Sequence, residues 1–182
     1  MWKKLLFSAL ALAALAAAYV RPAYSVELDG RPLPGLWSGA ALRDGLETAR
    51  AAAEELSRGG AAVSEPETRL RLSLRPAEGT AAELAAALLA DTPGVELAWR
   101  VSVDGVDIGL AADRSAFEET VLAYIAERAP AESLSTSLAS ELELRGVFIP
   151  EGRATPLAEL TGRLRALTAV AYVAADGQTR FA

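Results

Sequence analysis

The sequence predicts an α+β fold: two tandem β-hairpin, helix, strand, helix repeats that follow an N-terminal apolar signal or anchor helix. Two observations predict it. Strand-like stretches run into an Asp-Gly pair three times, at glycines 30, 105 and 177. Between them, helical and alternating patterns recur in the same order, as expected of an internal repeat. A chain of 182 residues has room for one ordinary domain or two small ones.

Residues 1–22 have the layout of a secretory signal peptide. Lys3 and Lys4 form a positive start, and the run Leu5–Val20 that follows contains no charge. The run is shorter than the ~20 residues that a helix needs to span a bilayer comfortably. Small residues at Ala16 and Ala18 offer a cleavage site.

An uncleaved signal anchor is the alternative. Trp2 and Tyr19 would then lie at the two membrane interfaces, with the N-terminus held in the cytoplasm. Both interpretations predict an extracytoplasmic chain, either secreted or membrane-anchored in the cell envelope.

The stretches Tyr24–Gly30, Trp99–Gly105 and Ala171–Gly177 each predict a strand that ends in a turn. Asp-Gly suits a type I′ turn, in which both central residues take positive φ. The three aspartates are also compatible with a metal or acid site, but nothing nearby supplies further ligands, and the turn is the favoured interpretation.

Repeat unit 1 covers 23–98. After the hairpin, a helix is expected from about Ser38 to Ser57, then an alternating strand, Arg69–Leu74. Thr80 and Glu83 form a capping box that predicts the start of a second helix.

Repeat unit 2 covers 99–170 and follows the same order. A helix is expected over 115–128, opened by a capping box of Ser115 and Glu118, then the strand Glu141–Leu144. Thr155 with Pro156 at the first helical position predicts the last helix. Residues 171–182 would begin a third hairpin or a truncated LysM-like segment.

The two alternating strands carry opposite charges. Leucines lie on one face of each, with Arg69 and Arg71 on the other face of the first strand and Glu141 and Glu143 on that of the second. The arginines of the first strand and the glutamates of the second could face each other if the two units pair.

The amino-acid composition excludes several kinds of catalytic and metal-binding site. The chain has neither histidine nor cysteine, and its lysines are Lys3 and Lys4 alone. This excludes a Ser-His or Ser-Lys nucleophile and the usual zinc ligands, so we assign no catalytic, cofactor-binding or metal-ligating residue and expect no enzyme. A carboxylate-dependent hydrolase is kept as a minor alternative, with three candidate pairs: Glu54 with Glu55, Glu118 with Glu119, and Glu141 with Glu143.

The remaining signals concern partners. A formal net charge of −6 disfavours nucleic acid, whose binding requires clustered basic residues. Trp37, Trp99, Phe148 and Tyr124 are candidates for a carbohydrate or peptide platform, although single aromatics in a chain that has few are typical core residues.

The pattern Val101 to Gly109, with a helix opening over 116–119, resembles the N-terminal repeat region of Gram-positive, clostridial-type cell-envelope proteins. In those proteins the repeats precede LysM and lysostaphin-type zinc endopeptidase domains. Tyr172, Gly177 and Thr179 fit the start of a LysM, whereas Ala174 and Gln178 depart from it. The peptidase's histidine ligands have no counterpart here.

This resemblance implies a noncatalytic, peptidoglycan-associated extracytoplasmic module that positions or regulates a wall-acting domain or partner. The expected partner is an envelope protein, or a wall-hydrolase or LysM domain that follows in the same chain. A module that binds peptidoglycan or glycan directly is the alternative. The membrane is a further partner if the N-terminal segment stays uncleaved.

Overall fold

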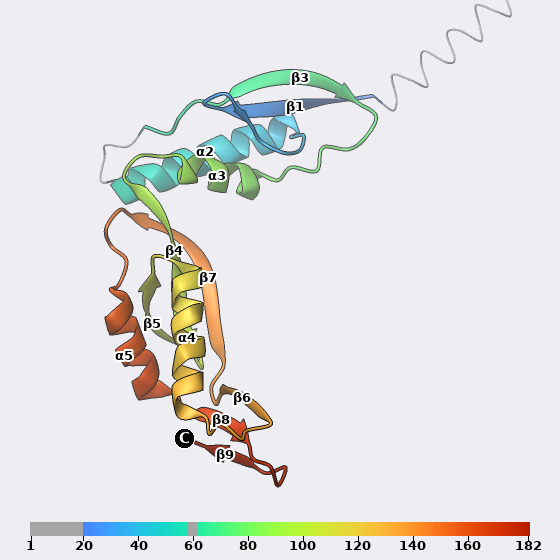
Figure 1. Cartoon of the computed structure of the whole chain (residues 1–182). Coiled ribbons are helices and arrows are strands. Elements are labelled where there is room, and N and C mark those ends of the chain that lie inside the picture. The colour runs from blue at the N-terminus through green and yellow to red at the C-terminus, as the bar shows by residue number, and fades with distance from the viewer. Residues whose placement is uncertain (1–19, 58–61) are drawn as a thin grey trace, which may run out of the picture. The chain divides into compact units, whose positions relative to one another are not determined.

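The computed structural model describes residues 20–57 and 62–182. They divide into unit 1, which extends to Pro93, and unit 2, Gly94–Ala182 (Figure 1). The predicted leader, residues 1–22, lies outside the described residues except at its end, where Arg21 and Pro22 already belong to the first strand. Within the described ranges, every helix is too short or too polar to cross a bilayer.

Unit 1 contains a three-stranded antiparallel sheet of order β2-β1-β3. Both helices of the unit lie on the same side of this sheet (Figure 1). In chain order, its elements are β1 (Arg21–Leu28), β2 (Arg31–Pro32), α2 (Gly39–Ser57), β3 (Glu67–Ser73) and α3 (Ala81–Ala90).

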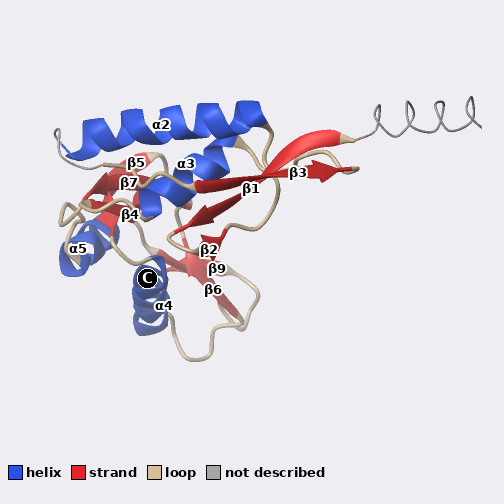
Figure 2. Ribbon diagram, turned by 90° about the horizontal axis from the view of Figure 1, so that it is seen from above, coloured by secondary structure: helices blue, strands red, loops and turns tan. Residues whose placement is uncertain are grey.

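Unit 2 contains two three-stranded antiparallel sheets, β5-β4-β7 and β6-β8-β9. Figure 2 distinguishes its helices from its strands by colour. In chain order, its elements are β4 (Val95–Val103), β5 (Val106–Ala111), α4 (Arg114–Arg128), β6 (Ser135–Leu138), β7 (Leu142–Pro150), α5 (Leu157–Leu167), β8 (Val170–Val173) and β9 (Thr179–Phe181).

The prediction of a mixed helical and stranded fold is confirmed, with four helices and small antiparallel sheets in the described residues. In both units a hairpin and a helix come before a strand that pairs with the first strand of the hairpin, β3 with β1 and β7 with β4, and a second helix follows that strand. Unit 2 differs by the additional strand β6, which the sequence patterns did not predict, and β7 extends to Pro150, well beyond the expected Glu141–Leu144.

Two of the three Asp-Gly turns have the predicted type I′ geometry. Asp29 and Asp104 both take positive φ, of 45° and 49°, and a positive-φ glycine follows each. The prediction is wrong for the third pair, where Gly177 alone has positive φ. There Gly177 N–H donates to the Ala174 carbonyl at 2.9 Å, and the Asp176 carboxylate accepts from Gln178 N–H, which makes a longer loop between β8 and β9.

The helix starts were predicted with mixed success. The Thr80–Glu83 capping box is present at the start of α3. The prediction for α4 is wrong, because Asp113 is its N-cap and accepts hydrogen bonds from the backbone N–H groups of Ser115 and Ala116. It is also wrong for α5, where Pro156 occupies the N-cap position itself and, among the described residues, no side chain caps the helix.

The core of unit 2 lies between its β5-β4-β7 sheet and the helices α4 and α5. Phe117, Leu160, Leu164 and Val101 are fully buried there. In unit 1, leucines 84, 88 and 89 of α3 are buried, as are Ala49 and Ala53 of α2 and Val26 of β1. Burial of these apolar side chains is the main favourable contribution to each unit's stability.

Candidate functional site

The three carboxylate pairs considered for hydrolysis lie on three different elements. Glu54 and Glu55 are exposed on α2, Glu118 and Glu119 lie on α4, and the exposed Glu141 and Glu143 lie just before and within β7. Glu118 is already ion-paired to Arg114 at 2.7 Å. Over the ranges that the structure describes, no group of three or more acidic side chains could hold a metal ion.

Two carboxylates have a pKa below their ordinary values, and both are engaged in local backbone contacts. Glu83 accepts hydrogen bonds from the backbone and side chain of Thr80, and these lower the pKa of its carboxyl group. The pKa of Asp104 is lowered by hydrogen bonds from Ser140 and from Glu141 N–H. Both groups therefore stay charged at neutral pH and serve as acceptors.

The four aromatic candidates do not gather into one platform. Trp37 and Tyr124 are buried in different units at 3% exposure each, and the Tyr124 hydroxyl donates to the Thr168 carbonyl at 3.0 Å. Trp99 and Phe148 are half-buried on β4 and β7. The guanidinium of Arg114 lies over the Trp99 ring, 5.1 Å from its centre.

Unit 1 has a surface hollow of about 490 Å³ beside Trp37. Apolar side chains of Leu33, Pro34 and Trp37 form part of its lining, together with the carboxylates of Glu78 and Glu83. Trp37 is held in place through its backbone, which exchanges two hydrogen bonds with Tyr24. Apolar rings beside a few polar groups are typical of a small ligand site.

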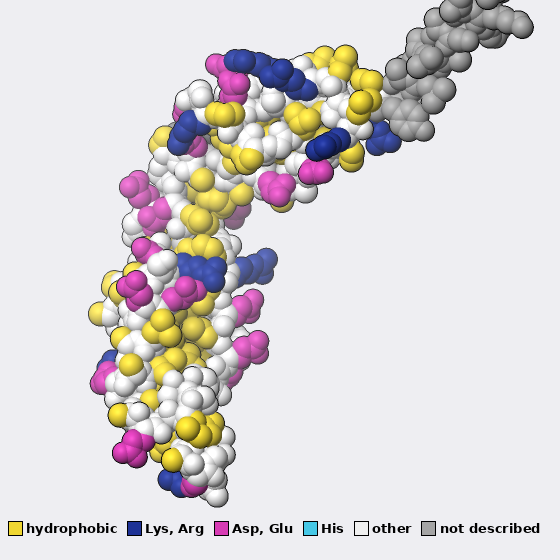
Figure 3. All heavy atoms as spheres, turned by 45° about the vertical axis from the view of Figure 1, so that its right-hand side comes forward, with side chains coloured by type: hydrophobic (Ala, Val, Ile, Leu, Met, Phe, Trp, Pro, Cys, Tyr) yellow, Lys and Arg dark blue, Asp and Glu magenta, His cyan; other side chains and the backbone are white. Residues whose placement is uncertain are grey.

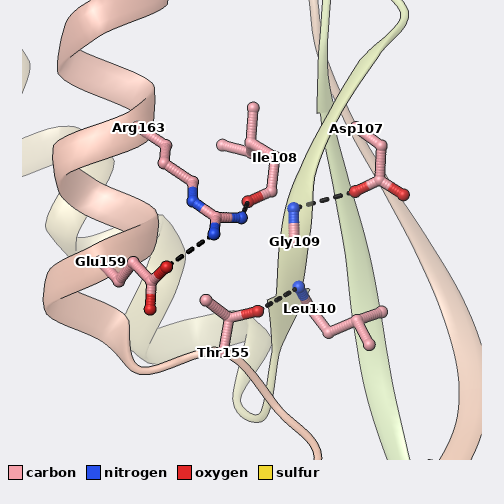
Figure 4. A network of polar contacts seen from close by, with 7 residues as sticks. All are labelled: Asp107, Ile108, Gly109, Leu110, Thr155, Glu159 and Arg163. Atoms are coloured by element: carbon pink, nitrogen blue, oxygen red, sulfur yellow. Dashed lines mark hydrogen bonds and ion pairs between the residues drawn. The ribbon is translucent and has the colours of Figure 1, made fainter.

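A polar network in unit 2 joins α5 to β5 (Figure 4). Arg163 donates to the Ile108 carbonyl at 2.7 Å and to Glu159 at 2.6 Å. The Thr155 hydroxyl accepts from Leu110 N–H at 3.1 Å. Arg163 and Thr155 bond to backbone groups of β5, and Glu159 belongs to the same helix as Arg163. The network therefore holds α5 on the sheet, and these residues present no free reactive group.

The most unusual surface is the edge strand β3. Its leucine face is exposed, at 60% for Leu70 and 75% for Leu72, and Leu74 just beyond the strand is 75% exposed. An edge strand also has a row of backbone N–H and C=O groups without strand partners. Hydrophobic and charged side chains intermingle on the face of each unit seen in Figure 3.

Sequence reasoning identified the alternation of β3 and placed its leucines on one face, but it did not show that this face is exposed. Exposure depends on which helices cover the sheet and how far they reach, and a local pattern does not contain that information. The signal that could have indicated it is the density of arginines, because charged residues typically mark edge strands. Comparison of the chain with protein-family models, with curated proteins and with solved structures finds no match.

Proposed function

We propose that this chain is a noncatalytic extracytoplasmic module of a bacterial cell-envelope protein, and that it positions or regulates a wall-acting domain or partner through its strand edges. The observation that carries the proposal is the edge strand β3, with its free backbone edge and the exposed leucines 70 and 72. Addition of a strand at such an edge is a common way for proteins to recognise one another.

The two units support this proposal. In each unit a strand that follows the first helix pairs with the first strand of the hairpin, β3 with β1 and β7 with β4, although the additional strand β6 precedes β7 in unit 2. We interpret them as tandem copies of one repeat, in keeping with the resemblance to repeat regions that precede LysM and endopeptidase domains. The equivalent strands, β3 in unit 1 and β7 in unit 2, each lie at the edge of a three-stranded sheet.

The N-terminal sequence supports an extracytoplasmic location. Lys3 and Lys4 precede the uncharged run Leu5–Val20, which is the pattern of an export signal. The test is protease accessibility of a C-terminal tag on the full chain in bacterial spheroplasts. We expect added protease to remove the tag from intact spheroplasts.

A matched pair of variants tests the cause of export. Leu12→Arg places a charge in the middle of the apolar run, where it opposes membrane insertion by roughly 3 kcal/mol, and should leave the tag protected. Ser25→Arg adds the same charge beyond the run and should leave the tag accessible. A wild-type tag that is digested only after lysis contradicts the proposed location.

Direct binding of wall glycan or peptide is the second candidate, favoured by the hollow beside Trp37. Sedimentation with purified peptidoglycan separates the two functions. An adaptor stays in the supernatant. A direct binder sediments, and Pro34→Arg, which places a long charged side chain at the rim of the hollow, should then release it, whereas Arg43→Glu on α2 should not.

A further inference from the structure

We infer that the partner of the β3 edge is the β7 edge of a second copy of this chain, in an antiparallel register that opposes Leu70 to Leu142. This inference rests on the proposed adaptor role, because both use strand edges for docking. It adds the identity of the partner at one of these edges. Among the described strands, β3 and β7 each lie at the edge of a three-stranded sheet. Three independent features, namely backbone groups, charge and apolar surface, agree on this one register.

The first feature is the direction of the backbone groups on β3. In an antiparallel pair, the N–H and C=O of one residue point to the same side, and this side alternates along the strand. On β1, Tyr24 and Val26 bond to Trp37 and Leu33, away from β3. The odd-numbered residues of β1 therefore bond to β3, and their partners there are odd-numbered as well. The even-numbered residues Thr68 and Leu70 consequently direct their N–H and C=O to the open edge.

The same reasoning applies to β7. The carbonyl of Glu141 accepts from Asp104 N–H at 2.9 Å, and Glu151 N–H donates to the Gly94 carbonyl, both on the β4 side. Odd-numbered residues of β7 thus face β4, and Leu142 and Leu144 face outward. Two open edges can pair only where outward residues meet, and Leu70 opposite Leu142 satisfies this condition.

The second feature is charge. The register that opposes Leu70 to Leu142 also opposes Arg71 to Glu141, Arg69 to Glu143 and Glu67 to Arg145. All six side chains are then on one face, in positions where opposite charges attract. All six are exposed in the single chain. Of these six, only Arg69 has an ion-pair partner within the part of the chain that the structure describes, Glu27 at 3.3 Å.

The third feature is the apolar face. Leu70 is 60% exposed on β3, and Leu142 and Leu144 are half-buried against the core of unit 2. In this register Leu70 lies beside Leu142, and Thr68 lies beside Leu144. Leu70 of one copy would extend the apolar surface of the other, which gives the contact a hydrophobic contribution as well.

Symmetric contacts between copies fit less well. Pairing β3 with β3 about Leu70 opposes Arg69 to Arg71 twice, and like charges in these positions repel. Pairing β7 with β7 about Leu144 opposes Glu143 to Arg145 twice, which is favourable, but it leaves the leucines and arginines of β3 uncovered. Substitution of Arg71 distinguishes the two contacts of β7. Arg71 takes part in the contact between β3 and β7 but not in the symmetric contact between two β7 strands.

The experiment measures association of the purified full chain by sedimentation velocity in detergent, which shields the apolar run Leu5–Val20. We expect concentration-dependent association of wild type, weakened roughly tenfold by Arg71→Glu and by Glu141→Arg. Arg43→Glu, the same charge change on the exposed surface of α2, should have no effect. Far-UV circular dichroism verifies that each variant is folded.

Mixing is the decisive step. Arg71→Glu protein has a β3 that suits the β7 of Glu141→Arg protein, so an equimolar mixture should associate more strongly than either variant alone. Recovery requires contact between two chains. A mixture that stays monomeric, or wild-type association that Arg71→Glu leaves unchanged, overturns the inference; the latter result would indicate the symmetric β7 contact.

Because the chain contains no cysteine, disulfide trapping gives a second readout. Directly opposed residues of antiparallel strands have Cα atoms about 5.5 Å apart, within reach of a disulfide. A mixture of Leu70→Cys and Leu142→Cys chains should form a covalent heterodimer on mild oxidation, whereas the exposed Leu122→Cys on α4 should not link to Leu70→Cys. Failure here concerns self-association alone, since export and wall association are tested separately in cells.

Discussion

Thr80 and Thr155 precede equivalent helices in the two units but make different hydrogen bonds. Thr80 caps α3, accepting from Glu83 N–H at 3.2 Å. Thr155 instead accepts from Leu110 N–H on β5, and Pro156 takes the N-cap position of α5. Proline fixes φ but offers no side-chain acceptor. The equivalent threonines therefore differ in role: Thr80 caps a helix in unit 1, and Thr155 joins helix to sheet in unit 2.

Gly109 is a residue at which the close approach of β5 and α5 leaves no room for a side chain. Its φ is 136°, and a Cβ there would lie 2.7 Å from the Thr155 hydroxyl and 2.9 Å from Leu160. We predict that Gly109→Ala lowers the free energy of unfolding by about 2 kcal/mol, from strain and overpacking together.

Urea denaturation measures this change, with Gly162→Ala as the control. Gly162 is exposed within α5 and a Cβ there meets nothing within 4 Å, so alanine should raise the stability of the helix by up to about 1 kcal/mol. Equal effects of the two substitutions would show that the approach at Gly109 is not tight in solution.

Glu83 and Asp104 predict how stability depends on pH. Both have a folded pKa below the ordinary values of 4.5 and 3.8, so their hydrogen bonds stabilise the fold fully above those values. As the pH falls through the lower, folded pKa values, the carboxylates are protonated and this stabilisation is lost. Between pH 5 and 8 the two groups contribute no pH dependence.

Glu83→Gln and Asp104→Asn test this prediction, because neither amide titrates. Urea midpoints measured from roughly pH 6 down to pH 2 should fall less steeply for each variant than for wild type. Glu55→Gln, an exposed carboxylate on α2, is the matched control. A control that flattens the profile as much as Glu83→Gln would contradict the assignment.

At the scale of elements, the start of α4 shows which of two nearby residues becomes the N-cap of a helix. Asp113 and Ser115 are both good N-cap residues, and the sequence pattern Ser-x-x-Glu favours Ser115. In the structure Asp113 is the cap, accepting from Ser115 N–H at 2.7 Å, while Glu118 bonds to Arg114. The N-cap of α4 therefore lies two residues before the one that the pattern predicts, and the helix begins at Arg114.

We predict that Asp113→Ala destabilises unit 2 by about 1 kcal/mol, whereas Ser115→Ala changes its stability by less than about 0.5 kcal/mol. Thermal unfolding of the two variants provides the measurement. A larger effect for Ser115→Ala would mean that the predicted capping box forms in solution.

The strand β3 shows that sequence periodicity can predict a strand without predicting which of its faces is buried. Alternation of arginine and leucine correctly predicted a strand, and the structure places it over Glu67–Ser73. Alternation usually implies one buried face, yet Leu70 and Leu72 are largely exposed. Only the placement of the covering helices decides whether the apolar face of an edge strand is buried.

For the whole molecule, each unit has its own core. Leu84 in unit 1 and Leu160 in unit 2 are both fully buried. We predict that Leu84→Ala and Leu160→Ala each remove about 2–5 kcal/mol, and that the loss appears first in the unit that contains the substitution. Hydrogen exchange measured by mass spectrometry resolves the two units.

Leu122→Ala is the control for this prediction, since Leu122 lies on α4 with 65% of its surface exposed. It should leave exchange in both units near the wild-type rates. If Leu84→Ala accelerates exchange in both units equally, they unfold as one cooperative body.

The sequence by itself determined the mixed helical and stranded fold class, the order of the elements in unit 1, the turns at Asp29 and Asp104 and the cap of α3. These features depend on interactions within a few residues, such as positive φ at Asp-Gly or a hydroxyl facing its own first turn, so a local pattern specifies them. The absence of histidine and cysteine likewise limits the chemistry of this chain without reference to any fold.

The tertiary structure alone decided which strand became an edge, which leucines remain exposed and which backbone groups point outward from β3 and β7. It also decided that Thr155 bonds to Leu110, 45 residues away in the sequence. These features depend on pairings between distant segments, in which a shift of one residue reverses the faces of a strand. The candidate docking edges belong to this second group, because their hydrogen-bonding groups become visible only after the sheet is assembled.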